Sequence, residues 1–244
     1  MRFAFISDIH ANLEALDAVL GDIGKEAVDE IICLGDIVGY GSEPNECTEL
    51  VRKNCTLVLL GNHDAAAVKL LDTHLFNNYA RIAIDWTSRT LRKAHRTYLL
   101  GLPLTATTGP LTLVHATPYE PGMWYYITSL EEAAFNFHHF ETEVCLVGHT
   151  HIPTIVVLDG KKEVYAHQAG HINLRDTPGA KYLINVGSVG QPRDRIIKSC
   201  YGIFDDATGE FYFRRVAYDI PATQARMRKA KLPEFLVTRL SEGR

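Results

Sequence analysis

The sequence lacks any long hydrophobic run, and none of its apolar stretches approaches the roughly 18–20 residues that cross a bilayer. The apolar stretch within residues 1–8 is also too short for a signal peptide. The five cysteines are odd in number and include no Cys-x-x-Cys pair, so a disulfide framework is not expected. Together these absences predict a cytoplasmic protein that is not held in a membrane.

A basic surplus is also missing, since the formal net charge is −4 and the pI is about 6.3. Proteins that bind long nucleic acids usually carry such a surplus, because neutralising phosphates dominates their affinity. The one basic stretch, residues 226–231, has the pattern of the solvated face of a C-terminal helix. A long nucleic acid is therefore not an expected partner.

The chain of 244 residues, 46% of them hydrophobic, contains no flexible linker, low-complexity tract or repeat. This length and composition suffice for the core of one α/β domain. We predict a single domain over residues 1–244, with a C-terminal helical tail from about residue 221.

Short apolar runs bounded by glycine predict buried strands, which alternate with helical patterns in the first part of the chain. Asn12 is a good N-cap for the first helix, and Ser129 begins a capping-box pattern before a later one. Two more helices are expected over residues 44–53 and 77–99. Strands dominate after residue 151, at residues 154–158, 182–185, 201–204 and 210–216. The pattern predicts an α/β fold, either a mixed sheet or two packed sheets, with helices outside.

Polar residues follow five of the predicted strands at their carboxyl ends. They are Asp8, His10, Asp36, Asn62, His63, His115, His149 and His151. Ligands of α/β sheets bind at that end of the strands, so we expect these side chains to form one site. Two pairs, Asp8/His10 and His149/His151, have one residue between them, and such residues point to the same side of an extended chain.

This set offers imidazole and carboxylate ligands without thiolates, which suits Mn, Fe, Zn, Co or Ni rather than a structural zinc site. Two divalent ions about 3.5–4 Å apart can share these ligands, generate hydroxide near neutral pH and support in-line attack at phosphorus. His63, beside Asn62, is then the natural candidate to protonate the leaving alkoxide. Each motif alone is usually incidental, so the prediction depends on their joint presence.

The same residues resemble the five-part signature of the calcineurin-like metallophosphoesterase superfamily, in particular its small bacterial phosphoesterase branch. The matching motifs are Asp8-x-His10, Gly35-Asp36, Gly61-Asn62-His63-Asp64, His115 and Gly148-His149-x-His151. The resemblance implies a two-sheet αββα sandwich with its metal site at the carboxyl ends of strands. It also implies that one metal takes Asp8, His10 and His151, that the other takes Asn62, His115 and His149, and that Asp36 bridges both. His63 would protonate the leaving group or stabilise the transition state.

The second motif departs from the pattern of family members that dephosphorylate proteins. Those enzymes usually carry Gly-Asp-x-Val-Asp-Arg-Gly, whereas residues 35–41 read Gly-Asp-Ile-Val-Gly-Tyr-Gly. Gly39 replaces the aspartate that would orient the histidine, and Tyr40 replaces the arginine that would hold substrate. A protein Ser/Thr phosphatase is therefore not expected, and another group must orient His63. Some small bacterial phosphodiesterases of the superfamily have Cys at this position, so His63 keeps proton donation to a poor leaving group available.

Two further segments stay open between a functional and a structural interpretation. Residues 119–126 are rich in aromatic side chains and form either a lid that stacks on a nucleobase or a packed loop or oligomer contact. In residues 185–194, the glycines and Arg193 can reach a phosphate, or the segment is a turn with a surface pair between Arg193 and Asp194. We take Tyr40 and Arg193 as candidate substrate-binding residues.

The sequence thus predicts a phosphoric ester hydrolase that uses two divalent ions, with manganese expected to serve in vitro. The expected substrate is a small phosphate ester or phosphoanhydride, with a preference for a nucleotide such as a dinucleoside polyphosphate. A phosphodiesterase or nuclease, and a non-catalytic scaffold of the same fold, are the alternatives. The native metal, the substrate and the oligomeric state stay open.

Overall fold

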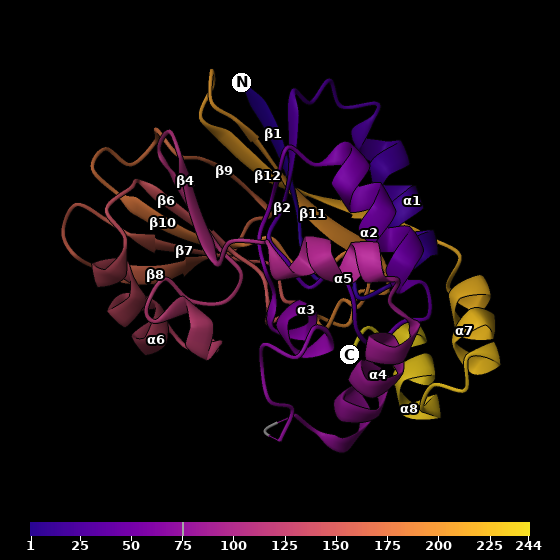
Figure 1. The fold of residues 1–244 in the computed structure, drawn as a ribbon. Coiled ribbons are helices and arrows are strands. Elements are labelled where there is room, and N and C mark those ends of the chain that lie inside the picture. The colour runs from indigo at the N-terminus through magenta and orange to yellow at the C-terminus, as the bar shows by residue number, and fades with distance from the viewer. Residues whose placement is uncertain (75) are drawn as a thin grey trace.

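The computed structural model describes residues 1–74 and 76–244, and within them the strands form two mixed sheets of six strands each (Figure 1). The first sheet has the order β3 (Leu57–Val58), β2 (Glu30–Cys33), β1 (Arg2–Ile6), β11 (Ser199–Asp205), β12 (Glu210–Val216) and β9 (His171–Asn173). The second has the order β4 (Thr105–Thr108), β5 (Leu111–Val114), β6 (Val144–Val147), β10 (Lys181–Asn185), β7 (Thr154–Leu158) and β8 (Val164–His167). Parallel pairing joins β1, β2 and β3 in one sheet and β5, β6 and β10 in the other.

The main core lies between the two sheets. Successive residues of β1 alternate between its faces, so Phe3 and Phe5 pack into this core while Ala4 and Ile6 face the other way. Leu113 and Leu146 contribute from the second sheet. Burying large apolar side chains from both inner faces is what holds the sheets together.

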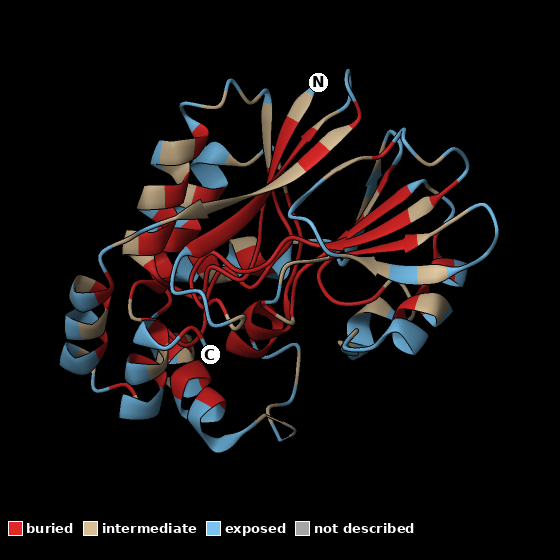
Figure 2. Ribbon diagram, turned by 180° about the vertical axis from the view of Figure 1, so that it is seen from behind, coloured by how far each residue is buried: buried red, intermediate tan, exposed pale blue. Residues whose placement is uncertain are grey.

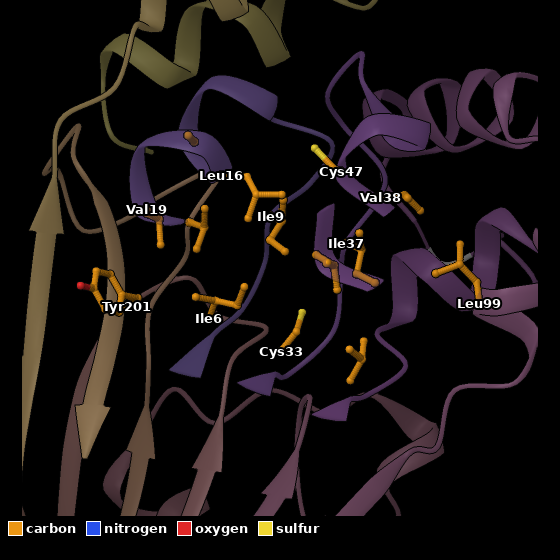
Figure 3. Close-up of a cluster of buried hydrophobic side chains, with 14 of the residues drawn as sticks. Ile6, Ile9, Leu16, Val19, Cys33, Ile37, Val38, Cys47, Leu99 and Tyr201 are labelled. Carbon is orange, nitrogen blue, oxygen red and sulfur yellow. The ribbon is translucent and has the colours of Figure 1, made fainter. Parts of the chain in front are cut away.

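Helices cover the outer face of the first sheet. They are α1 (Leu13–Ile23), α2 (Pro44–Asn54) and α5 (Lys93–Leu100). Figure 3 shows Ile6 and Cys33, from β1 and β2, facing Leu16 and Val19 of α1 in a second buried cluster. Asn12 caps α1 as expected, since its Oδ1 accepts a hydrogen bond of 3.2 Å from the backbone N–H of Ala15.

On the opposite side, α6 (Leu130–Asn136) and the 3₁₀ turn η2 (Phe137–His139) cover the second sheet. Ser129 and Glu132 form the predicted capping box at the start of α6. Ala133 and Phe137 pack on Val147 and Leu183 of the sheet. Helices therefore lie outside both sheets, which confirms the predicted αββα sandwich, and their outward faces are exposed (Figure 2).

The helix predicted over residues 77–99 is wrong in one respect, because the structure divides it into α4 (Asn78–Thr90) and α5. The side chain of Asn45 causes the break by bonding the backbone on both sides of it. Its Nδ2 donates to the carbonyl of Thr90 at 3.1 Å, and its Oδ1 accepts from the N–H of Arg92 at 2.8 Å. These bonds replace the helical pairing that the chain gives up there.

The C-terminal segment begins its helical part at residue 220, close to the predicted start. It comprises α7 (Ile220–Lys229), α8 (Glu234–Thr238) and the 3₁₀ turn η3 (Arg239–Ser241). Ile220, Met227 and Leu240 are buried together with Ala83 of α4 and with Tyr40. The segment is thus packed against the body of the protein, beside one of the candidate site residues.

The remaining short elements are α3 (Asn62–Ala67) and the 3₁₀ turn η1 (Pro121–Met123). All five cysteines are free. Among the described residues, no helix combines the length and the apolar character that a membrane crossing requires.

The close approach of the β10–β11 connection to the β1 loop yields a stability prediction. A Cβ added at Gly190 would lie 1.8 Å from the carbonyl oxygen of Ile9, so Gly190→Ala must displace backbone and should lower the free energy of unfolding by about 1–3 kcal/mol. Gly21→Ala is the matched control, since Gly21 lies in α1 with nothing within 4 Å of its added Cβ. That change should stabilise by about 0.5–1 kcal/mol. Urea unfolding measures both, and equal stability of the two variants would contradict this packing.

Candidate metal centre

The structure brings the eight polar residues that follow strand ends into one buried cluster. Side-chain nitrogen or oxygen atoms within 4.8 Å of one another define three overlapping groups: Asp8 with His10 and His151; His10 with Asp36 and His63; and Asp36 with His115 and His149. The eighth residue joins through the amide Oδ1 of Asn62, which lies 3.2 Å from Nε2 of His115. All eight are buried, and Figure 2 shows buried segments filling the centre of the molecule.

Each sheet supplies part of the cluster from the carboxyl ends of its parallel strands. The loops after β1, β2 and β3 carry Asp8, Asp36 and Asn62, the last opening the short helix α3. The loops after β5 and β6 carry His115 and His149. The site therefore lies where the strand ends of both sheets meet, as the α/β pattern predicted.

The prediction that the Asp8/His10 and His149/His151 pairs converge because they lie on extended chain is wrong. These four residues do not lie on extended chain, since their φ angles are +53°, +51°, +67° and +63°. Asp36 has the same left-handed backbone, with φ +53°. Non-glycine residues adopt this conformation at a cost, and such residues cluster at functional sites. The backbone curls at these five positions, which directs their side chains toward one another.

Hydrogen bonds between loops hold this backbone. The N–H groups of Asp8 and His10 donate to the carbonyls of Gly35 and Asp36, both at 3.0 Å. The N–H of His149 donates to the carboxylate of Asp8, with 3.0 Å to Oδ2, and so joins the second sheet to the first. The strained conformations are thus maintained by contacts between segments far apart in the sequence.

The imidazoles of His10 and His151 are oriented for a cation. Their Nδ1–H groups donate to the carbonyls of Val38 at 3.2 Å and Gln191 at 2.7 Å, which leaves both Nε2 atoms unprotonated in the neutral rings. These two Nε2 atoms lie 3.1 Å apart. Two facing lone pairs repel each other unless a cation is shared between them, and carbonyl-oriented histidines of this kind are typical metal ligands.

The other half of the cluster has the same character. Nδ1 of His115 donates to the carbonyl of Leu34 at 2.9 Å, so its Nε2 faces Oδ2 of Asp36 at 3.4 Å. Nε2 of His149 is buried and has no hydrogen-bond partner among the described residues. A buried nitrogen without a partner is costly, and a metal ion would satisfy it. The residues present therefore fit divalent metal ions.

Burial and charge point the same way. Burial raises the pKa of Asp8 to about 7, with a further increase from the neighbouring carboxylate of Asp36. Burial lowers the pKa of His149 to about 3, so its imidazole stays neutral and free to bind a metal. His115 differs, because the effect of burial, which lowers its pKa, is outweighed by the carboxylates of Asp36 and Asp8, which raise this pKa to about 9. Two buried carboxylates beside mostly neutral imidazoles need positive charge, which divalent cations would supply.

His63 lies at the edge of the cluster, where aromatic rings hold it instead of a carboxylate. Its ring centroid is 4.4 Å from that of Tyr40, 4.8 Å from that of His10 and 5.1 Å from that of Phe76. A Cβ added at Gly39 would lie 2.5 Å from Nδ1 of His63, so position 39 touches the histidine but leaves no room for a side chain. Burial lowers the pKa of His63 to about 4. Ring packing thus answers the question of what orients this histidine.

Arg193 reaches the same region from the β10–β11 connection. Its Nη2 donates to Oε1 of Gln191 at 2.8 Å and to the hydroxyl of Tyr40 at 3.4 Å. The guanidinium carbon lies 5.8 Å from the centroid of the Tyr40 ring, a cation–π contact. The alternative of a pair between Arg193 and Asp194 is wrong, because Asp194 pairs with Arg215. Arg193 keeps a half-buried positive charge facing the cluster.

The connection after β10 supports the cluster in a way that the sequence did not reveal. The hydroxyl of Ser188 and the N–H of Gly190 both donate to the carbonyl of Asp8, at 2.8 and 2.9 Å. The expectation that these glycines reach a phosphate was wrong, because Gly187 and Gly190 pack tightly against Cys200 and Ile9. The glycines provide close packing, and their only signal in the sequence was their spacing.

Asp64 belongs to the third motif, where the sequence predicted no role for it, and in the structure it is buried and connects two loops. Its carboxylate accepts hydrogen bonds from the N–H of Val38 at 3.0 Å and from the N–H of Gly61 at 3.1 Å. It thereby ties the loop after β2 to the loop after β3, which carry Asp36 and Asn62. A carboxylate in this position keeps two metal-site loops in register.

Comparisons with known proteins agree with this geometry. A model of the calcineurin-like phosphoesterase superfamily domain matches residues 1–209. An uncharacterised protein of Methanocaldococcus jannaschii is 42% identical over 246 residues, which cover 99% of this chain and 98% of that protein. The crystal structure of a metallophosphoesterase from Sphaerobacter thermophilus is 44% identical, with complete coverage of both chains and a TM-score of 0.88. A hypothetical protein from Pyrococcus horikoshii is 22% identical, with 100% and 98% coverage and a TM-score of 0.80, and has the same fold.

The cluster predicts that manganese stabilises the protein. After treatment with a chelator, Mn²⁺ at about 100 times its dissociation constant should raise the melting temperature by about 5–10 °C, since ions that bind only the folded state stabilise it. Asp36→Asn should remove most of this shift, because Asp36 belongs to two of the three ligand groups. Asp85→Asn, which changes an exposed residue of α4, is the control and should keep it. Equal shifts in both variants would contradict the ligand role.

Proposed function

Because the chain belongs to the calcineurin-like phosphoesterase superfamily, we propose that it hydrolyses a small phosphate ester or phosphoanhydride with the help of two divalent metal ions. Membership of the family makes the protein a metal-dependent phosphoric ester hydrolase. The observation that carries the two-metal proposal is the set of three overlapping ligand groups, which share His10 and Asp36. One metal position would leave several of these buried nitrogen and oxygen atoms without a partner.

We assign the ligands as the family resemblance implies. One ion would be held by Asp8, His10 and His151, the other by Asn62, His115 and His149, with Asp36 shared. Such ions, when bound, supply Lewis acidity toward a phosphoryl oxygen and a hydroxide nucleophile near neutral pH. Mn, Fe, Zn, Co and Ni all suit this donor set, and manganese is the ion we would add first in vitro.

His63 is our candidate for the residue that assists the leaving group. It lies beside the ligand cluster, and packing against Tyr40 and Phe76 restricts its ring. Nδ1 is buried without a partner among the described residues, which leaves the imidazole uncommitted to a structural hydrogen bond. Because burial lowers the pKa of His63 to about 4, its imidazole is neutral near pH 7. We therefore propose that an N–H of His63 donates a hydrogen bond to the leaving oxygen and so stabilises the transition state.

Arg193 and Tyr40 are our candidates for contacts with the substrate phosphate. Arg193 is held in place by Gln191 and Tyr40, so its guanidinium is already oriented toward the cluster before an anion arrives. A guanidinium binds phosphate oxygens in a bidentate manner, and prior orientation lowers the entropy lost on binding. Tyr40 positions this arginine and also contacts His63.

Two features favour a small substrate. Position 40 carries tyrosine where protein phosphatases of the family carry arginine, and the net charge of −4 does not favour a long nucleic acid. Within the class of small phosphorylated molecules we propose a nucleotide, such as a dinucleoside polyphosphate. The intact ligand set and the presence of His63 argue against a non-catalytic scaffold.

A substrate screen tests this function. With Mn²⁺ present, nucleotides and dinucleoside polyphosphates should be hydrolysed faster than phosphopeptides, DNA or simple mono- and diesters. Preferential release of phosphate from phosphopeptides would contradict the proposed substrate class. Absence of hydrolysis from every compound, together with absence of bound transition metal, would favour the scaffold.

The proposed roles of His63 and Arg193 predict that loss of the first lowers kcat and that loss of the second mainly raises KM. His63→Ala should keep the metal content and lower kcat by about 10²–10³ on esters with poor leaving groups, as expected for loss of a hydrogen-bond donor that stabilises the transition state. Arg193→Ala should mainly raise KM, by at least about tenfold, because it removes a charged phosphate contact. Lys198→Gln removes a positive charge from the same connection at an exposed position and is the control. Metal loss in His63→Ala as large as in Asp36→Asn would instead make His63 a ligand.

A further inference from the structure

A pocket of about 480 Å³ lies beside the metal-ligand cluster and has no part in the roles assigned above. We call it the aromatic pocket. Its walls come from the segment after β5 and from α6, and consist of Thr117, Tyr119, Tyr125, Tyr126, Glu131, Glu132, Phe135 and Asn136. Half of these residues are aromatic, and Tyr125, Tyr126 and Phe135 expose 44%, 52% and 49% of their surface. Large aromatic side chains gathered in one exposed hollow are characteristic of a binding site.

The aromatic pocket borders the metal-ligand cluster, because Tyr126 lines the pocket and also contacts a histidine of the cluster. The ring of Tyr126 stacks on that of His149, with 4.1 Å between centroids and 29° between planes. Trp124, from the same segment, lies 5.9 Å from the ring of His115. Both histidines are assigned to the same metal ion. A ligand whose phosphate reaches that ion can therefore extend directly across Tyr126 into the pocket.

The backbone around η1 is bent to make this arrangement. Glu120 and Trp124, on either side of the turn, have φ angles of +43° and +58°. Non-glycine residues rarely adopt this conformation, and the surrounding structure must compensate for its cost. The bends place Trp124 and Tyr126 against the ligand histidines and leave Tyr119 and Tyr125 facing each other, nearly parallel at 15° and 6.0 Å.

The side chains of Thr117, Asn136 and Glu132 in the pocket are already bonded within the protein. The hydroxyl of Thr117 donates to the carbonyl of Tyr119 at 2.8 Å, and Oδ1 of Asn136 accepts from the N–H of Tyr119 at 3.4 Å. Glu132 accepts from the N–H of Ser129 at 3.0 Å in the capping box of α6. What remains for a ligand is mainly ring surface. Such a surface suits a flat, apolar ligand group, because stacking on aromatic rings needs no hydrogen-bond partner.

Charge decides which end of a ligand enters. Glu131 and Glu132 line the pocket, and Glu120 accepts a hydrogen bond from the hydroxyl of Tyr125 at 3.5 Å. These carboxylates repel phosphate groups and favour N–H donors such as the exocyclic amino group of a base, whereas Arg193 and the proposed metal ions attract phosphate. A nucleotide is complementary to this division, with its base in the aromatic pocket and its phosphate at the metals.

We propose that the aromatic pocket binds the nucleobase of a nucleotide substrate and so selects nucleotides over other phosphate esters. This inference rests on the proposed function, because it uses the metal centre as the phosphate site. Tyr125 and Phe135 supply ring faces, and Tyr126 joins the base site to the metal site. The pocket thereby distinguishes phosphate esters by the organic group that is attached to the phosphate.

Two probes that differ only in the base test the proposal: AMP and ribose 5-phosphate. Calorimetric titration into the Mn²⁺-loaded protein should show AMP binding about ten- to a hundredfold more tightly, the range expected for one stacked base. Tyr125→Ala should reduce this ratio to near one. Tyr125→Phe retains the ring and should preserve the ratio. Tyr165→Ala, which removes an exposed tyrosine of β8 outside the pocket, should also preserve it.

The outcomes separate the base site from the proposed function. Equal binding of the two probes to the unaltered protein, or a ratio unchanged by Tyr125→Ala, would overturn the base site while leaving a phosphoesterase intact. Failure of both probes to bind, with no ester hydrolysed, would overturn the proposed function and the base site with it. Sedimentation of the same variants gives a further check. If Tyr125→Ala dissociated a dimer without altering the ratio, the pocket would be an interface between copies of the chain.

Discussion

Two buried carboxylates, Asp8 and Asp36, are surrounded by imidazoles from both sheets, and the centre of the molecule depends on compensating their charge. These groups are buried, and burial favours the neutral form of Asp8 and of His10. The lone pairs of His10 and His151 face each other at 3.1 Å. Metal ions would resolve both problems together, because they would compensate the negative charge and separate the facing nitrogens. The cluster therefore has the donor set and the unbalanced charge that suit divalent cations.

The backbone around this cluster is strained. Five ligand positions have left-handed φ angles, and the contacts that hold them come from elsewhere in the chain. Asp64 joins the loops after β2 and β3, and Ser188 and Gly190 fasten the carbonyl of Asp8. The αββα sandwich serves as a rigid base for these loops, since its two sheets place their strand ends beside one another. Local strain at the ligands is maintained by the packing of the whole fold.

Around the metal-ligand cluster, aromatic rings pack against histidines at positions where charged side chains could lie. Tyr40, His10 and Phe76 hold His63, and Gly39 is too close to Nδ1 of His63 to carry a side chain. On the other side, Tyr126 stacks on His149 and opens the aromatic pocket. Rings position neighbours without adding charge, so the positive potential near the cluster comes from Arg193 and the metals. Ring surface and positive charge thus lie in separate places, which favours a substrate with a flat group at one end and an anionic group at the other.

The sequence by itself determined the residue types of the site, their order and their position after strands, because each motif is local and follows a short apolar run. It also indicated the capping of α1 and α6, which depends on neighbouring residues. The strand pattern left one mixed sheet or two packed sheets open, and the resemblance to the superfamily implied two sheets. Only the tertiary structure decided how the side chains of the site converge, since the left-handed backbone at five of them is held by partners such as Ser188 and Gly190, which lie about 180 residues from Asp8 along the chain. The same holds for the Asn45 bonds that divide α4 from α5 and for the rings that orient His63. Contacts between distant segments leave no periodic signal in the chain, and they appear only once the sheets and loops are packed.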